Sequence, residues 1–225
     1  MTNEFVVGLT YADRLRMATT ARHQSIRQIM DSELVELTTL MGPMSDGPEW
    51  PAGPAWIATR HSNNGCVISD GLSDPWVERD RPETGRGLEI FIESADSGIG
   101  DDDSLSRLAD TWLFPMTAEI SHTLVGNPKL CERLINGELS SLEFNIEHIK
   151  DGRGRVGALL NMPTPFSNSL TLPGGYVRLV PATLLTVAEL RFLRGKGEAG
   201  RQELAEKLTA AGVGHLSFLN RPAVI

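Results

Sequence analysis

Two aspartates four residues apart, Asp70 and Asp74, are the first candidates for chemistry in this sequence. They lie in ISDGLSDPW (68–76), each next to a serine, with Trp76 directly after. Paired carboxylates beside hydroxyl groups can perform general acid–base catalysis when a cleft holds them together. Asp70 directly precedes Gly71 and Asp74 directly precedes Pro75, and both pairs are typical of turns. We favour two consecutive turns at a strand end, with carboxylates accepting backbone hydrogen bonds.

A Cys–His pair is the second candidate. His61 and Cys66 lie on opposite sides of a predicted Asn64-Gly65 hairpin turn. Such a pair can act as a nucleophile and its base. A hairpin also brings these positions together without any catalytic role, and nothing in the sequence lowers the pKa of the thiol. We favour the structural interpretation.

Metal, phosphate and cofactor sites are not indicated. The five histidines show no pair at ligand spacing, and HExxH and CxxC are absent. The segment SGIGDDD (97–103) follows no phosphate-binding template and carries acidic charge. Arg153 and Arg155, in DGRGRVG, have the chemistry to grip one carboxylate or phosphate, but arginines at an exposed turn are the favoured interpretation. We therefore predict no cofactor and no metal.

Composition places the chain among ordinary globular proteins. It has 225 residues, 40% of them hydrophobic, and a formal net charge of −8. This acidic balance argues against nucleic acid as a ligand, and it either favours a basic partner or merely aids solubility. No signal peptide or membrane-spanning run is recognised, so we expect a cytoplasmic protein without membrane association.

The first 53 residues differ from the rest of the chain in their predicted secondary structure. Thr10 to Met41 is predicted as one long helix, or two joined near residues 19–25, with capping patterns at Thr10 and Ser25. Four prolines in residues 42–54 then predict irregular structure. We expect 1–53 to be a helical segment plus linker, and 54–225 to be a separate domain.

Residues 54–225 read as strands and helices without regular alternation. Hairpins are predicted around residues 62–65 and 150–154, a half-buried strand over 87–94, a further strand from Gly175, and a terminal strand over 215–220. Helices are predicted at 104–113, 115–125, after Asn127, at 186–194 and at 198–211. The sum is an α+β fold with a central mixed, largely antiparallel sheet flanked by helices.

The order of these features resembles the Suppressor of fused family. The family hallmark is a GLSD turn followed by a GFGFEL-type strand, and this chain has GLSDPW followed by GRGLEIFIES. Looser matches follow in the right order: LADTWLFPM, LINGELSS, YVRLVPATLLTVAELRFL, RQELAEKL and FLNRPAVI. The resemblance covers about residues 54–225.

The resemblance implies an α+β domain that binds proteins rather than one that performs catalysis. Animal members bind zinc-finger transcription factors between this domain and a second, C-terminal domain that has no counterpart in this sequence. Short bacterial members are linked with polymorphic toxin systems as presumed immunity proteins. The expected partner is therefore a protein, such as a basic toxin domain, and not nucleic acid. Asp74, Trp76 and Glu89 are the candidate partner-binding residues.

A second hypothesis from another class stays open at this point. Asp70, Asp74, Glu89 and His61 are the polar groups that the turn and the following strand would present to a small ligand or substrate. This hypothesis, an unrecognised enzyme or small-molecule-binding protein, requires that these side chains converge on a concave pocket.

The apolar face of the N-terminal helical segment generates a first prediction. The segment either packs on the sheet as an added helical layer or mediates dimerisation. If it packs on the sheet, deleting residues 1–41 exposes apolar surface, and we expect lower solubility. Ile29 and Leu37 are among the apolar residues of the predicted helix face that we expect to take part. Expression level, light scattering and thermal melting of the truncated chain measure the effect. A soluble, cooperatively melting fragment would instead show that the segment is peripheral.

Overall fold

Eight strands form one mixed sheet in the computed structural model, which describes residues 8–37, 48–100, 103–145 and 155–225. The strands are β1 (Val35–Leu37), β2 (Trp56–His61), β3 (Asn64–Ser69), β4 (Leu88–Ser94), β5 (Ser140–Phe144), β6 (Val156–Leu160), β7 (Ser169–Leu172) and β8 (Gly175–Leu185). Their order is β1-β2-β3-β4-β8-β6-β5, and β7 pairs with β8. Only β4 and β8 run parallel among these pairs; the others are antiparallel. The predicted fold class is confirmed.

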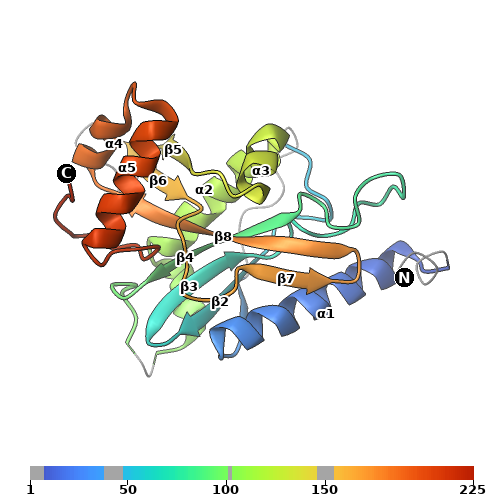
Figure 1. The fold of residues 1–225 in the computed structure, drawn as a ribbon. Coiled ribbons are helices and arrows are strands. Elements are labelled where there is room, and N and C mark those ends of the chain that lie inside the picture. The colour runs from blue at the N-terminus through green and yellow to red at the C-terminus, as the bar shows by residue number, and fades with distance from the viewer. Residues whose placement is uncertain (1–7, 38–47, 101–102, 146–154) are drawn as a thin grey trace.

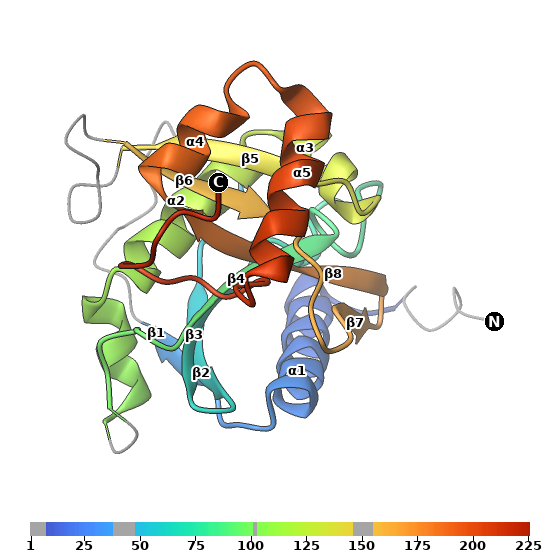
Figure 2. The same ribbon diagram turned by 60° about the vertical axis from the view of Figure 1, so that its left-hand side comes forward.

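Helices cover both faces of the sheet (Figures 1 and 2). They are α1 (Tyr11–Met30), the 3-10 helix η1 (Leu105–Asp110), α2 (Leu113–Val125), α3 (Pro128–Ile135), α4 (Val187–Leu193) and α5 (Gly197–Ala210). The first hydrophobic cluster joins one face of the sheet to η1, α2 and α3. On the other face, α1 packs on β2, β3, β4, β7 and β8, while α4 and α5 pack on β6 and the end of β8.

The helix α1 begins where the sequence predicts and ends earlier. Thr10 and Asp13 form the predicted capping box, and Asp31 ends the helix in the left-handed conformation with φ of 50°. The predicted second cap at Ser25 is wrong, because Ser25 lies inside one continuous helix. Residues 35–37 are a strand instead of helix, and the rest of the predicted helix, 38–41, lies outside the described residues.

The strand β4 is buried on both faces, whereas the sequence predicted a half-buried strand. The predicted alternation is correct, since Leu88, Ile90 and Ile92 face the α2 side. Every residue of β4 is nevertheless buried, because β3 and β8 flank it and helices cover both of its faces. Glu89 and Glu93 are therefore core residues, with exposed fractions of 0% and 1%.

Most other predicted elements are present, with shifted boundaries. The β2–β3 hairpin turns at Ser62 and Asn63, so Asn64-Gly65 begins β3. Pro115 lies in the first turn of α2, and the break from η1 comes at residues 111–112. The strands β5 and β6 pair as predicted, although their connection, 146–154, lies outside the described residues. The helices α3, α4 and α5 form near the predicted positions.

The predicted terminal strand at 215–220 is wrong. This segment runs along the sheet without strand pairing, and the Ser217 amide donates to the Glu93 carbonyl at 2.8 Å. The Ser217 hydroxyl accepts from the Leu184 amide and donates to the Ala182 carbonyl. These bonds lie where β8 leaves β4 to pair with β6, just after Pro181, which has no amide hydrogen. A single serine therefore satisfies the backbone groups that a strand would have paired.

The helix α1 shares its hydrophobic core with the sheet, so the division at residue 53 stays a prediction. Among the described helices, none is long and apolar enough to cross a membrane.

Candidate functional site

The turn that follows β3 is held from beneath by Arg22 of α1. The Arg22 Nε donates to Asp70 Oδ1 at 2.7 Å, and Nη1 donates to Asp74 Oδ1 at 2.7 Å. Nη1 also contacts the Ser73 hydroxyl at 3.2 Å, and Nη2 donates to the Asp70 carbonyl at 3.1 Å. One guanidinium therefore binds both carboxylates whose spacing suggested chemistry.

Glu89 closes the same turn from the sheet side. Its Oε1 accepts from the amide and the hydroxyl of Ser73, at 2.9 Å and 2.6 Å, and its Oε2 accepts from the hydroxyl of Ser69. The Ser69 hydroxyl in turn accepts from the Ile90 amide at 2.9 Å. Glu89 Oε1 lies 3.7 Å from Arg22 Nε. The two serines of the motif thus connect the turn to β4.

A glycine allows the turn to pack closely against the chain that precedes β2. A Cβ atom on Gly71 would lie 2.4 Å from the carbonyl oxygen of Gly53, a backbone atom that cannot swing away. The Asp70 amide donates to the Ala55 carbonyl beside it, at 2.9 Å. Only glycine fits at this position of GLSD.

Burial makes the electrostatics of this cluster unusual. Burial lowers the pKa of Arg22, but the charges of Asp70, Glu89 and Asp74 more than offset this effect, so the guanidinium stays charged. Burial raises the pKa of Asp74 above its usual value despite Arg22, and raises that of Glu89 to about 7. The pKa of Asp70 is lowered, since hydrogen bonds from His23 and Arg22 outweigh its burial. One guanidinium facing three carboxylates favours a protonated Glu89.

Trp76 lies next to this cluster, under the loop that connects the turn to β4. Its side chain is buried, and the Arg81 guanidinium lies over its ring. The Arg14 Nη2 donates to the carbonyls of Trp76 and Val77, and Nη1 pairs with Glu83 at 2.7 Å. A second arginine of α1 therefore fixes the backbone of this loop.

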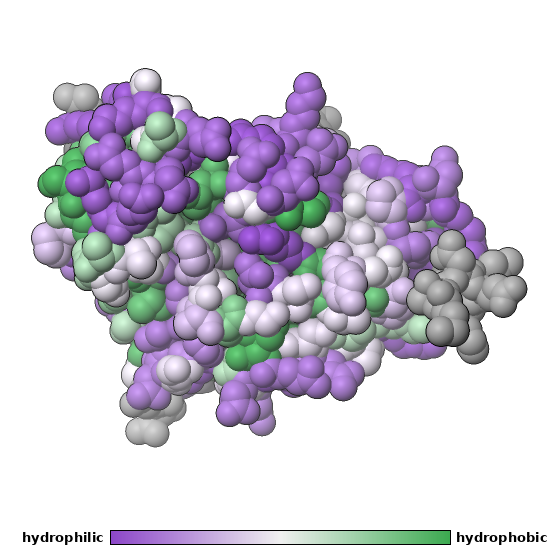
Figure 3. All heavy atoms as spheres, viewed as in Figure 1, coloured by the Kyte–Doolittle hydropathy of each residue, from purple (hydrophilic) through white to green (hydrophobic). Residues whose placement is uncertain are grey.

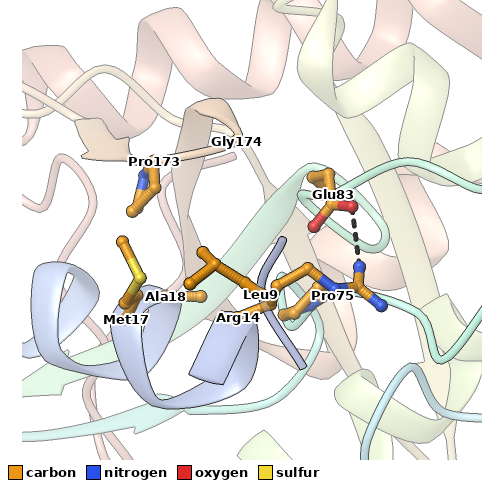
Figure 4. A pocket seen from close by; sticks show the side chains of 8 residues that line it. All are labelled: Leu9, Arg14, Met17, Ala18, Pro75, Glu83, Pro173 and Gly174. Atoms are coloured by element: carbon orange, nitrogen blue, oxygen red, sulfur yellow. Dashed lines mark hydrogen bonds and ion pairs between the residues drawn. The ribbon is translucent and has the colours of Figure 1, made fainter. Parts of the chain in front are cut away.

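A small pocket lies beside Arg14 (Figure 4). It has a volume of about 30 Å³ and is lined mostly by apolar groups from α1 and from the loops before β4 and β8; the residues are Leu9, Arg14, Met17, Ala18, Pro75, Glu83, Pro173 and Gly174. The space is enough for one water molecule. It is too small for a metabolite.

His61 belongs to a different cluster, centred on Glu93. The two carboxylate oxygens of Glu93 contact His61 Nδ1 and His215 Nε2, each at 3.0 Å, and Asn64 Nδ2 donates to Oε1 at 2.6 Å. Burial raises the pKa of Glu93, but the hydrogen bonds from His215, Asn64 and His61 outweigh it and lower the pKa overall. This cluster joins the β2–β3 hairpin to the C-terminal segment.

The Cys–His hypothesis gains no support from this arrangement. Cys66 pairs across the hairpin with Thr59, and the imidazole of His61 is directed to Glu93. Burial and the charge of Glu93 raise the pKa of the Cys66 thiol well above its usual value. A raised pKa is the opposite of what a nucleophilic cysteine requires.

The structure brings Asp70, Asp74 and Glu89 together but not around a pocket. The guanidinium of Arg22 occupies the space on which they converge, and His61 lies in the separate Glu93 cluster. Among the described residues, no group of three or more histidine, cysteine, aspartate or glutamate side chains has a geometry suited to a metal ion. This arrangement stabilises a turn and offers a substrate no access to the carboxylates.

The predicted partner-binding residues are all core residues. Asp74, Trp76 and Glu89 have exposed fractions of 5%, 2% and 0%. Their contact with a partner stays a prediction, and in this structure they shape the surface from beneath. Arg155, predicted to bind a carboxylate or to lie at a turn, pairs with Glu143 at 3.0 Å; Arg153 lies outside the described residues.

Arg22, at the centre of the site, is not among the residues predicted from the sequence. The buried face of α1 consists of Arg14, Ala18, Arg22, Ile26 and Met30, at a spacing of four residues. Two arginines at core positions of an amphipathic helix require buried acceptors. This pattern was the available signal that α1 meets the Asp70–Asp74 turn.

Comparison with known proteins supports the fold alone. No family model matches the chain, and no curated protein sequence is significantly similar to it. Among solved structures, the crystal structure of Drosophila Suppressor of Fused matches with a TM-score of 0.54 and 16% sequence identity, over 92% of this chain and 51% of that chain. The chain therefore spans about half the length of that protein and has a Suppressor-of-Fused-like fold.

The Arg22 ion pairs generate a second prediction. Replacing Arg22 by methionine removes the ion partner of the buried Asp74 and leaves Asp70 with its contact to His23 alone, and we expect a loss of about 3–5 kcal/mol in the free energy of unfolding. The matched control is Arg16→Met on the same helix, because the Arg16 side chain is 76% exposed and its pair with Asp13 is worth little. Urea unfolding measures both. Equal losses would contradict a central role for Arg22.

The raised pKa of Glu89 generates a third prediction. The native carboxyl keeps its proton up to about pH 7, whereas the unfolded one releases it near 4.5. Between these values the native state binds more protons, so the free energy of unfolding falls as pH rises, by up to about 3 kcal/mol from this group.

Glu89→Gln removes this titration. We expect its free energy of unfolding to depend less steeply on pH between about 5 and 7 than that of the wild type. Urea unfolding at several pH values measures the slopes, and Glu119→Gln, at an exposed position on α2, serves as the control. Parallel profiles for the wild type and Glu89→Gln would show that Glu89 is ionised throughout this range.

Proposed function

We propose that this chain is a non-catalytic protein-interaction module of the Suppressor of fused type. The observation that carries the proposal is the Suppressor-of-Fused-like fold over 92% of the chain. The GLSD turn and the GLEIFIE strand, on which the sequence resemblance rests, lie together in this fold. Both lie against Arg22 in the core of the domain.

The geometry of the turn favours this function over catalysis. An acid–base pair must reach a bound substrate, but the carboxylates of Asp70 and Asp74 already bind a buried guanidinium at 2.7 Å. Glu89 accepts hydrogen bonds from two serines of the same turn. These bonds give the turn a fixed shape, and a fixed shape is what recognition of a protein partner needs.

The surface suits a polar and charged partner. On the face shown in Figure 3, hydrophilic residues predominate and hydrophobic residues lie in small separate groups. Because the chain carries a net charge of −8, long-range electrostatic attraction favours the binding of a basic protein. We propose a bacterial immunity or regulatory protein that covers and neutralises such a partner, for which a polymorphic toxin domain is the leading candidate. Asp74, Trp76 and Glu89 then act by shaping the contact surface.

Co-expression with the protein encoded by the adjacent reading frame tests this function. We expect a stable complex by size-exclusion chromatography, and protection of cells when that protein is toxic. Electrostatic steering predicts that the association rate falls steeply with salt. A partner that binds equally fast at high salt would contradict the proposed basic character of the partner.

A panel of metabolites provides the opposing test. Ligands that bind only the native state raise its melting temperature. We expect no metabolite to do so at concentrations near those in cells. A saturable shift from one metabolite, together with the absence of a complex with the adjacent gene product, would favour the small-molecule function instead.

A further inference from the structure

The ring of Trp76 is covered by an arginine of the same chain. The Arg81 guanidinium carbon lies 3.2 Å from the centre of the Trp76 ring. The Arg81 Nη1 also contacts both carboxylate oxygens of Glu49, at 3.1 Å and 3.2 Å, and lies 3.8 Å from Glu78 Oε2. We propose that Trp76, Glu49 and Glu78 form a guanidinium-binding site that Arg81 occupies in the free protein and that an arginine side chain of a basic protein partner takes over.

The chemistry of the three groups matches a guanidinium. An indole face attracts a cation through its ring quadrupole, and tryptophan is the best of the aromatic residues for this contact. Both carboxylate oxygens of Glu49 accept from the Arg81 Nη1, and Glu78 lies 3.8 Å from the same nitrogen, so the charge of a cation on the ring is balanced beside it. The planar guanidinium stacks on the indole face, which a compact ammonium matches less well. The Arg86 guanidinium lies 5.1 Å from the same ring, and its Nη2 donates to the Glu49 carbonyl at 3.3 Å, which ties the Glu49 segment to the loop that carries Trp76.

The ion pairs that hold Arg81 on the ring are partly exposed to solvent. The Arg81 side chain is 33% exposed, and its partners Glu49 and Glu78 are 66% and 55% exposed. Ion pairs in such positions contribute little to stability, because water screens them. These ion pairs therefore add little to the cost of displacing Arg81, and an incoming arginine replaces the stacking on Trp76 that Arg81 gives up. The Trp76 side chain is 2% exposed in the free protein.

The backbone of Trp76 is held by contacts that do not depend on Arg81. Arg14 donates to the carbonyls of Trp76 and Val77 at 3.1 Å and 3.0 Å, and Asp74, two residues earlier, is bound to Arg22. These contacts come from α1 and do not involve Arg81. The ring therefore keeps its position when the covering guanidinium leaves, so the site is preorganised for an incoming arginine.

The choice of a protein arginine rests on the proposed function. A chain with net charge −8 attracts basic proteins, and arginine and tryptophan are the residues that most often dominate the energetics of interfaces. The exchange of one guanidinium for another leaves the net charge of the site unchanged. Binding thus needs no new buried charge on this side of the interface.

Arg81→Ala tests the site directly by removing the internal occupant. The probe is a blocked tripeptide, acetyl-Gly-Arg-Gly-amide, followed by isothermal titration calorimetry and by acrylamide quenching of tryptophan fluorescence. We expect the variant to bind the probe about tenfold more tightly than the wild type, and the probe to protect Trp76 from quenching. The Trp76→Phe variant identifies the contribution of this tryptophan to the fluorescence.

Two controls separate this site from general attraction to an acidic protein. The same peptide with citrulline in place of arginine keeps the shape and lacks the charge, and we expect it not to bind. Adding Glu49→Gln and Glu78→Gln to Arg81→Ala should return the affinity to the wild-type level. If Arg81→Ala lost its cooperative melting transition, Arg81→Gln would carry the same test with a larger side chain in the loop.

The outcomes distinguish this inference from the proposed function. Equal probe binding by Arg81→Ala and the wild type, or equal binding of the citrulline peptide, overturns the guanidinium site even if the chain forms its complex with the adjacent gene product. Tight, arginine-specific binding by Arg81→Ala supports the site even if that complex is not found, in which case only the proposed partner is wrong.

Discussion

Arg22 is buried among three carboxylates, and its position determines how the N-terminal helix meets the sheet. Its side chain is 1% exposed, so each of its hydrogen bonds has to be made within the protein. The bonds reach Asp70 and Asp74 in the turn after β3, and Glu89 of β4 is close by. A helix, a turn and the central strand are thereby fixed to one another. The apolar contacts of α1 bury surface area against the sheet, while this charged cluster fixes the position of the helix relative to the turn and to β4.

The buried carboxylate of Glu93 holds together the other half of the sheet face on which α1 packs. Glu93 lies four residues after Glu89 on β4 and binds His61 of β2 and His215 of the C-terminal segment. Between α1 and the α4–α5 pair, this segment follows the sheet without becoming a strand, and Ser217 satisfies the backbone groups there. Two glutamates on one face of one strand therefore organise the ends of the chain: Glu89 faces α1, and Glu93 faces residues 215–217.

In the proposed function, Trp76 links the core of the domain to the surface that meets a partner. The ring is positioned from beneath by α1, through Arg14 on its backbone and Arg22 on Asp74. It is covered from outside by Arg81, whose ion partners lie in solvent. The inner contacts are buried and strong, whereas the outer ones are exposed and weak. This difference is the basis of the proposed exchange, in which one side chain moves while the Trp76 backbone keeps its position.

Local patterns in the sequence determined much of the secondary structure. The capping box at Thr10, the alternation of β4 and the helix after Asn127 depend on residues close together in the chain, so they can be predicted from spacing alone. The sequence also placed Asp70 and Asp74 in turns. Only the tertiary structure decided that every residue of β4 is buried, because this depends on helices that cover both faces of the sheet and on parallel pairing with β8, about ninety residues later. It likewise decided that Arg22 binds both aspartates from 48 and 52 residues away, since a charged side chain in a core can be satisfied only by groups that folding brings to it.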